Sequence, residues 1–418
     1  MFKFIHTADI HLDSPLKGLE AHEDAPVEEI RGATRRAFEN LIDFAIEESV
    51  NCVLIAGDLY DGDWKDYNTG LFFAGQMGKL EKEGVKVFIV SGNHDAASRL
   101  TKNMPLPGNV TMFPSGKPQS VKLDDHGVVI HGQSYSSRSV MDNLALQYPP
   151  HDSNEFNIGL LHTSLTGRAG HENYAPCSID DLNSRGYDYW ALGHVHKREV
   201  LSEDPMILFP GNIQGRHIRE TGAKGATLVA VEDGRIVDVE NLEFDVLRWS
   251  VCTVDVSESE SKEDVYEKVR RALEKEQSRA NGKPVAVRLQ LVGRCFMHSD
   301  LHERSHHWRE EFRGIAVGLG DVWLEKVKIQ TDSKGDLEDI FGDDSPFAGL
   351  LQTFENLDLG EVELTSVVQE LSNLKTKLPP ELLGPDSVFE YTASDLAELK
   401  EGVKELLIAK LLQHGDEL

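Results

Sequence analysis

The stretch CVLIAGDLYD, residues 52–61, decides the fold class of this 418-residue chain. Five consecutive apolar residues, Cys52 to Ala56, predict a strand buried on both faces, and a glycine and an aspartate end it. Apolar residues from Phe38 to Ile46 recur at helical spacing before this strand, and a second strand-like run, Val85 to Val90, follows a further helical pattern. This alternation predicts an α/β fold in which polar residues at the carboxyl ends of parallel strands form the ligand site.

The composition is that of a folded protein, with 40% hydrophobic and 27% charged residues and a net charge of −28. Such a charge excludes a protein whose whole surface attracts polyanions. Residues 336–418 carry 19 acidic and 5 basic side chains, which is half of the net charge, so a nucleic-acid surface must be local and lie before them. The four cysteines are scattered and form no CxxC pair, which predicts neither a disulfide framework nor a zinc module. The sequence also has no apolar leader and no apolar run long enough to cross a membrane, so we expect a cytoplasmic protein.

The chain divides into three expected parts. Strand patterns continue to about Phe244, so we expect a catalytic domain over residues 1–245. Alternating strand and helix patterns, including one helix from Leu301 to Phe312, predict a smaller α/β capping domain over residues 246–335. Residues 336–418 are expected to form an acidic linker and a helical C-terminal region, in which leucines from Leu396 to Leu411 share one helix face.

Five polar motifs each follow a predicted strand. They are DIH at 9–11, GDLYD at 57–61, GNHD at 92–95, His162 at a strand end, and GHVH at 193–196. Each motif alone is a weak signal, because a single histidine at a strand end is usually a hydrogen-bonded structural residue. Together they bring carboxylate, amide and imidazole donors to what we expect to be one edge of one sheet. The candidate metal ligands are Asp9, His11, Asp58, Asn93, His162, His194 and His196.

This donor set suits two divalent ions. Ions about 3.5–4 Å apart need a ligand that touches both, and Asp58 is the candidate bridge. Two ions and two carboxylates leave a charge of about +2 to hold hydroxide and a phosphate, so an acidic protein can have a cationic pocket. His94 follows a candidate ligand directly, and we expect it to stabilise the transition state or protonate the departing oxygen.

In content and order the motifs DxH, GDxxD, GNH[DE], H and GHxH resemble the calcineurin-like metallophosphoesterase family. The resemblance implies a four-layer αββα sandwich, with His94 as the catalytic histidine. It also implies two ligand sets that share one aspartate: Asp9, His11, Asp58 and His196 for one ion, and Asp58, Asn93, His162 and His194 for the other.

Within that family, the opening HTADIHLDSPL and the GDLYD block resemble SbcD-type DNA repair exonucleases, and PGNIQGRHIRE at 210–220 resembles a YhaO-like branch. The resemblance implies a two-metal-dependent phosphodiesterase that acts on DNA as an exonuclease. Endonuclease activity is a second activity compatible with the same resemblance. The resemblance also implies an SbcC-like ATPase partner, bound through the C-terminal helices. The sequence has no GxxxxGK[ST] motif, so ATP hydrolysis must come from such a partner. Asp61 stands where some of these nucleases carry a histidine, which leaves its role open.

Several assignments remain open at this point. Manganese is the expected metal because mixed Asp, Asn and His ligands suit it, and iron, zinc and magnesium are alternatives. Candidate contacts to DNA phosphates, which carry no sequence specificity, are Lys197, Arg198, Arg216 and Arg219, and a solvated charged loop is the alternative. Two other functions are a small-molecule phosphodiesterase or phosphatase of the same fold, and a catalytically silent scaffold subunit of an ATPase complex. A homodimer is neither required nor excluded.

Overall fold

The computed structural model describes residues 1–14, 16, 32–61, 67–97, 105–151, 154–165 and 174–333. The expected acidic linker and C-terminal helices, with Leu396 to Leu411, lie outside these residues. The chain forms two compact units. The first comprises Met1–Cys252, Arg271–Leu289 and Arg313–Lys326, and the second comprises Thr253–Arg270, Gln290–Phe312 and the described residues from Val327 onward.

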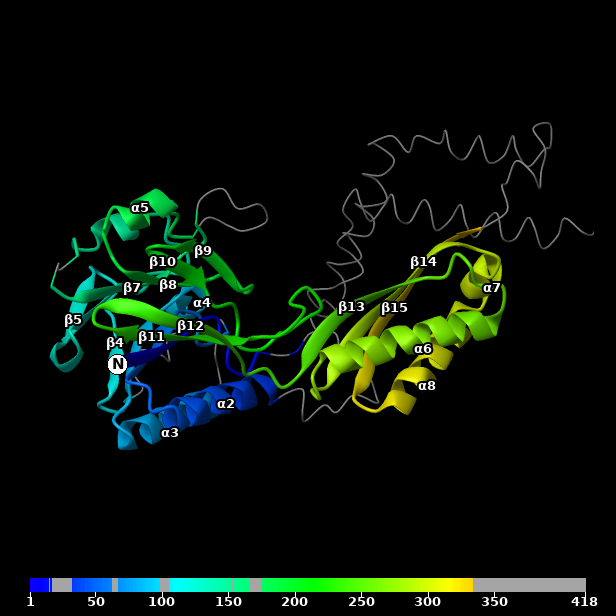
Figure 1. The fold of residues 1–418 in the computed structure, drawn as a ribbon, viewed down its shortest axis with the longest axis horizontal. Coiled ribbons are helices and arrows are strands. Elements are labelled where there is room, and N and C mark those ends of the chain that lie inside the picture. The colour runs from blue at the N-terminus through cyan, green and yellow to red at the C-terminus, as the bar shows by residue number, and fades with distance from the viewer. Residues whose placement is uncertain are drawn as a thin grey trace, which may run out of the picture. The chain divides into compact units, whose positions relative to one another are not determined.

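The first sheet is six-stranded and mixed, in the order β12-β11-β1-β2-β3-β4. Its strands β4, β11 and β12 are labelled in Figure 1. Strands β1 to β4 run parallel, and β11 and β12 extend the sheet as an antiparallel hairpin beside β1. The bounds are β1 Phe2–Thr7, β2 Cys52–Ala56, β3 Lys86–Val90, β4 Val110–Met112, β11 Gly225–Glu232 and β12 Arg235–Glu243. The strand predicted from CVLIA is therefore confirmed, as is its parallel neighbour β3.

The second sheet is also six-stranded and mixed, in the order β5-β6-β7-β8-β10-β9. Strands β6, β7, β8 and β10 run parallel, and β5 and β9 are antiparallel edge strands. The bounds are β5 Gln119–Leu123, β6 Val128–Gly132, β7 Phe156–His162, β8 Tyr189–Gly193, β9 Glu199–Glu203 and β10 Met206–Phe209. Strand β9 was not predicted, because its sequence EVLSE is too polar to give a strand signal.

Side chains alternate along the strands and so divide the core into layers. On β2, Val53 and Ile55 pack with helices α2 (Ala33–Glu47) and α3 (Tyr67–Lys82), while Leu54 packs between the two sheets. The outer face of the second sheet is covered by residues of connecting segments, such as Tyr148, and by the short elements η2 (Ala145–Gln147) and α5 (Ile179–Asn183). Three layers of the expected αββα sandwich are thus present, but in the described residues no long helix forms the fourth.

The carboxyl ends of β1, β2 and β3 meet those of β7 and β8. The first three strands are neighbours in one sheet, the other two are neighbours in the second, and β2 contacts both β7 and β8. The expectation that all the motifs share one sheet was wrong, because the motifs after β7 and β8 belong to the second sheet. The candidate site therefore lies where the carboxyl edges of two facing sheets come together.

A three-stranded sheet in the order β13-β14-β15 forms the core of a small α/β region. The strand and helix order was predicted, but the helix expected from Leu301 to Phe312 is two helices, because the backbone at Arg304 leaves the helical region (φ −107°, ψ 28°). The indole N–H of Trp308 donates to the Asp300 carboxylate across this break (2.8 Å). The bounds are β13 Arg248–Asp255, α6 Lys262–Arg279, β14 Val285–Cys295, α7 His298–Glu303, α8 Ser305–Leu319 and β15 Val322–Ser333.

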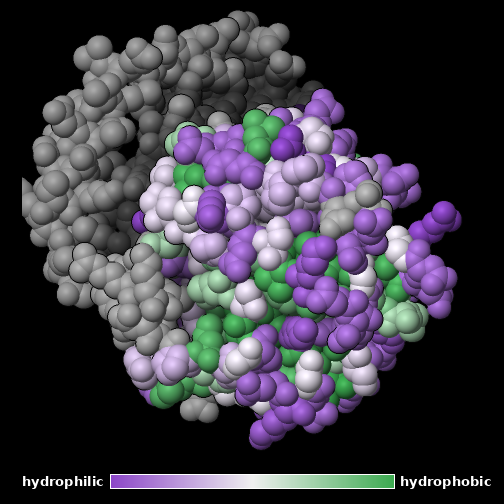
Figure 2. All heavy atoms as spheres, turned by 90° about the vertical axis from the view of Figure 1, so that its left-hand side faces the viewer, coloured by the Kyte–Doolittle hydropathy of each residue, from purple (hydrophilic) through white to green (hydrophobic). Residues whose placement is uncertain are grey.

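The surface and the cysteines agree with the composition. Seen from the left-hand side of Figure 1, hydrophilic residues cover most of the face, with apolar residues visible between them (Figure 2). All four cysteines are buried and free. Among the described residues, no helix combines the length and the apolar character that crossing a bilayer requires.

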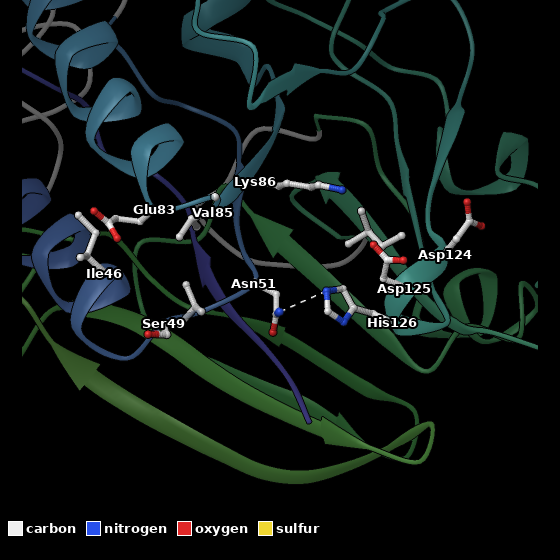
Figure 3. A pocket seen from close by; sticks show the side chains of 12 residues that line it. Ile46, Ser49, Asn51, Glu83, Val85, Lys86, Asp124, Asp125 and His126 are labelled. Carbon is white, nitrogen blue, oxygen red and sulfur yellow. Dashed lines mark hydrogen bonds between the residues drawn. The ribbon is translucent and has the colours of Figure 1, made fainter.

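A cavity of about 340 Å³ opens at the amino ends of β2 and β3 (Figure 3). Asn51 and His126, the latter in the 3-10 turn η1 (Asp124–His126), face each other at 3.2 Å in this cavity. Its lining also includes Lys86 and several carboxylates. Because the polar motifs follow the carboxyl ends of the same strands, this cavity lies at the other edge of the sheet and is separate from the candidate site.

Candidate metal centre

The structure brings the seven predicted ligand residues together. One group of His and Asp side chains joins Asp9, His11 and His196, and another joins Asp58, His162 and His194, with ligand atoms within 4.8 Å of one another in each group. A third such group contains His11, Asp58 and His94. The amide oxygen of Asn93 lies 3.0 Å from Nε2 of His162. Asp58 therefore lies close to members of both expected ligand sets.

Backbone strain marks four of these residues. Asp9, His11, Asp58 and His194 have φ values of 50°, 46°, 51° and 108°, in a region that costs a residue with a side chain about 1–3 kcal/mol. Main-chain hydrogen bonds hold this conformation, since the N–H of Asp9 donates to the carbonyl of Gly57 and the N–H of His11 to that of Asp58, both at 3.0 Å. The backbone therefore turns sharply where these strands end, and the side chains of these residues lie close together.

Three motif glycines allow the elements to approach closely. A Cβ atom at Gly57 would overlap the ring of His162, and one at Gly92 would overlap the carboxylate of Asp58. A Cβ atom at Gly193 would overlap the carbonyl oxygen of Ala56. Each of these glycines precedes a candidate ligand, so the G in GD, GN and GH is required by the packing of the centre.

The arrangement of lone pairs fits bound cations. Nδ1 of His162 lies 2.9 Å from the carbonyl oxygen of Ala56, and because a carbonyl only accepts, Nδ1 carries the proton and Nε2 presents a lone pair. That Nε2 faces the carboxylate of Asp58 at 3.5 Å. Nδ1 of His196 donates to the carboxylate of Glu220 (2.6 Å), so Nε2 of His196 also presents a lone pair, 3.4 Å from Nε2 of His11. Acceptor atoms that crowd together in this way are stabilised when a cation binds between them.

The buried carboxylates point to the same conclusion. Asp9 and Asp58 are 1% and 2% exposed. Burial and the neighbouring charge of Asp58 raise the pKa of Asp9 well above its usual range, and burial raises the pKa of Asp58. Two carboxylates buried side by side repel each other, and divalent cations relieve both the repulsion and the loss of hydration.

His94 lies at the edge of this group and has a partner of its own. Its side chain is 32% exposed, and its Nδ1 lies 3.1 Å from Oδ1 of Asp61. The hydrogen bond to Asp61 raises the pKa of His94. Burial acts to raise the pKa of Asp61, but hydrogen bonds with His11 and His94 hold it well below its usual range. Sequence reasoning left the role of Asp61 open, and the structure pairs it with His94.

Comparisons with known proteins agree with this geometry. The sequence-family model of the calcineurin-like phosphoesterases matches residues 2–198. The sequence-family model of the middle domain of metallophosphoesterase YhaO matches residues 249–332. A protein of Bacillus subtilis (strain 168) named "Uncharacterized metallophosphoesterase YhaO" is 36% identical over 368 residues, which cover 86% of this chain and 88% of that one. The chain belongs to the calcineurin-like metallophosphoesterases, in a YhaO-like branch. It is therefore a metal-dependent phosphoesterase with a dimetal centre of His and Asp groups.

This metallophosphoesterase is also similar to more distant proteins. The "DNA double-strand break repair protein Mre11" of Sulfurisphaera tokodaii is 26% identical over 300 residues, which cover 68% of this chain and 72% of that one. A dimetal phosphatase of Danio rerio of known structure is similar with a TM-score of 0.33 and 14% identity, over 56% of this chain and 93% of that one.

The four basic residues expected to contact phosphates differ in their surroundings. In this metallophosphoesterase Lys197 and Arg219 are exposed and Arg198 is half-buried. Arg216 is only 14% exposed, and its guanidinium lies within 3.8 Å of Asp61 and 3.5 Å of Glu220. Glu220 accepts a hydrogen bond from Nδ1 of His196 at 2.6 Å. Sequence reasoning missed Glu220, because nothing in its local pattern links it to a histidine 24 positions earlier.

Proposed function

We propose that this metallophosphoesterase hydrolyses DNA phosphodiester bonds without sequence specificity, as an exonuclease with endonuclease activity as an extension. The observation that carries the proposal is a dimetal centre in which one carboxylate is close to both ligand sets and a paired histidine lies at the open edge. The similarity to an Mre11 protein named for double-strand break repair supports DNA as the substrate. A small-molecule phosphodiesterase or phosphatase, and a silent scaffold subunit, are the alternatives that the test below distinguishes.

The proposed ligand sets are those that the family resemblance implies, and the groups of neighbouring side chains support them. Asp9, His11, Asp58 and His196 would hold one ion, and Asp58, Asn93, His162 and His194 would hold the other. Bound divalent ions, with manganese proposed first, supply Lewis-acid polarisation of phosphoryl oxygens and a water activated near neutral pH. The protein fixes the donors through strained backbone and close glycine contacts, so the ligands need little rearrangement on binding.

His94 is the proposed catalytic histidine. Asp61 holds its ring through Nδ1, which leaves Nε2 as the atom that donates a proton to the departing oxygen. The partial exposure of His94 suits a group that must reach a substrate, whereas His11 and His162 are fully buried. Lys197, Arg198 and Arg219 are the proposed contacts to flanking phosphates, where they would add affinity without reading base sequence.

The remaining parts of the proposal concern organisation and partners. We propose a catalytic domain over residues 1–245, a capping domain over 246–335, and docking of an SbcC-like ATPase on the C-terminal helices of a cytoplasmic enzyme. Copurification tests the partner: a coiled-coil ATPase is expected to be retained by the full chain and lost from a chain that ends at Ser333. Retention by both chains would contradict docking on the C-terminal region.

The substrate is tested with end-labelled DNA. Single-stranded, duplex and hairpin oligonucleotides are incubated with Mn²⁺, with an EDTA-treated sample and the His94→Ala variant as controls. We expect metal-dependent removal of nucleotides from an end, resolved on a sequencing gel. Turnover of cyclic or free nucleotide esters with inert DNA would replace the proposal with the small-molecule enzyme. Failure to cleave DNA, nucleotide esters or bis(p-nitrophenyl) phosphate would support the scaffold.

A further inference from the structure

We propose that Arg216 is a positioning residue that joins His94 to the metal ligand His196 by bridging two carboxylates, Asp61 and Glu220. The inference deepens the proposed function and rests on its phosphodiesterase chemistry, not on DNA as the substrate. It gives Arg216 a role different from the phosphate contact that the sequence suggested, because the guanidinium is already engaged by protein groups.

The first half of the bridge fixes His196. Oε1 of Glu220 lies 2.6 Å from Nδ1 of His196 and 3.5 Å from Nη2 of Arg216. Oε2 of Glu220 accepts hydrogen bonds from the backbone N–H of Arg216 (2.7 Å) and from the side-chain amide of Asn212 (2.9 Å). A carboxylate that holds the second ring nitrogen of a metal-bound histidine fixes the orientation of the ring and raises its basicity. Glu220 is 6% exposed, so its charge needs the compensating guanidinium.

The second half of the bridge fixes His94. Oδ2 of Asp61 accepts a hydrogen bond from the hydroxyl of Ser14 (2.8 Å). Oδ1 of Asp61 lies 3.1 Å from Nδ1 of His94. Nη1 of Arg216 donates to the same Ser14 hydroxyl (3.2 Å) and lies 3.8 Å from Oδ2 of Asp61. The guanidinium therefore presents one amino group to each carboxylate.

This division of contacts explains why the residue is an arginine. A planar guanidinium can place two rigid N–H groups toward two separate carboxylates at once, whereas the ammonium group of a lysine is a single point charge. Because Asp61 and Glu220 each hold a histidine, the two histidines are fixed relative to one another through a single side chain. We expect loss of Arg216 to misplace both rings while leaving the metal donors themselves in the protein.

Double-mutant cycles test the bridge. Arg216→Met is combined with Asp61→Asn and, separately, with Glu220→Gln, and hydrolysis of bis(p-nitrophenyl) phosphate with Mn²⁺ is measured together with Mn²⁺ affinity by calorimetry. Arg216→Met is expected to lower kcat by about 10–100-fold with KM little changed, and to weaken Mn²⁺ binding. In the Asp61→Asn background it should have little further effect on kcat, and in the Glu220→Gln background little further effect on Mn²⁺ affinity.

The controls separate positioning from other roles. Arg216→Lys should resemble Arg216→Met, free guanidinium should partly restore Arg216→Ala, and Arg235→Met on the exposed β12 should behave as wild type. If Arg216→Met increased KM alone, and did so equally in the Asp61→Asn and Glu220→Gln backgrounds, the proposal would be overturned in favour of a phosphate contact. A lower melting temperature with unchanged kcat and Mn²⁺ affinity would overturn it in favour of a purely structural role.

The same experiment distinguishes failure of this inference from failure of the proposed function. If the ester is hydrolysed and DNA is not, the cycles on kcat still decide the role of Arg216. If the wild-type protein hydrolyses neither the ester nor DNA, the double-mutant cycle of Arg216 and Glu220 still tests the bridge, because it measures Mn²⁺ affinity by calorimetry. Additive losses of Mn²⁺ affinity in that cycle would contradict the bridge.

Discussion

His94→Ala is expected to lower kcat for bis(p-nitrophenyl) phosphate by about 10²–10⁴-fold, the range for loss of a general acid, while both metal ions are retained. The proposed ligand sets do not include His94, whose Nδ1 lies 3.1 Å from Oδ1 of Asp61, so the variant leaves the seven proposed metal donors in place. Steady-state kinetics and elemental analysis of the same samples measure the two quantities.

A matched control separates this effect from a general loss of a histidine. His307 lies on α8 with a side chain that is 48% exposed, and His307→Ala should keep wild-type kcat and metal content. Because His94 also lies within reach of His11 and Asp58, metal loss is the informative alternative. If His94→Ala emptied the centre, His94 would be a ligand and its catalytic assignment would be wrong.

Asp58→Asn is expected to weaken both ions together by about 100-fold or more, because the variant removes the carboxylate that lies near both ligand sets. An asparagine keeps the shape and one carbonyl oxygen, so the hydrogen bond from the backbone N–H of His94 (3.0 Å) can persist. The melting temperature of the metal-free protein should therefore not fall, since the variant also removes a buried charge.

Calorimetric titration with Mn²⁺ gives the number and affinity of the sites in the Asp58→Asn protein. Asp238→Asn, an exposed position on β12, is the control and should bind as wild type does. Selective loss of one ion, with the other bound normally, would show that Asp58 belongs to one ligand set and does not bridge.

Local pattern predicted the central strands well, because β2 and β3 are almost wholly apolar and are followed directly by glycine and polar residues. The run 52–56 is buried at every position, and so is the run 156–162. Local pattern could not assign strands to sheets, because pairing depends on contacts between distant segments. The prediction brought the carboxyl ends of β2 and β7 together, as the structure does, but it placed both strands in one sheet, whereas they belong to two facing sheets.

The candidate ligands could be predicted because their motifs directly follow strands, whereas the residues that orient them could not. Asp61 and His94 are 33 positions apart, and Ser14 lies 47 positions before Asp61, so only the folded chain joins them. The same limit applies to histidines that are not ligands. His6, on β1, is fully buried and hydrogen-bonded to Tyr189 and to the carbonyl of Leu192, which lie 183 and 186 positions further along the chain.

The contact between Gly193 on β8 and Ala56 on β2 has a consequence for engineering this protein. Main chain meets main chain there, so the gap between the two sheets at this edge is as narrow as the polypeptide allows. Substitutions of apolar residues elsewhere in the interior can change the free energy of unfolding without widening that gap. A single methyl group at residue 193 would act as a wedge between the strands and would alter the separation of the donors that they carry.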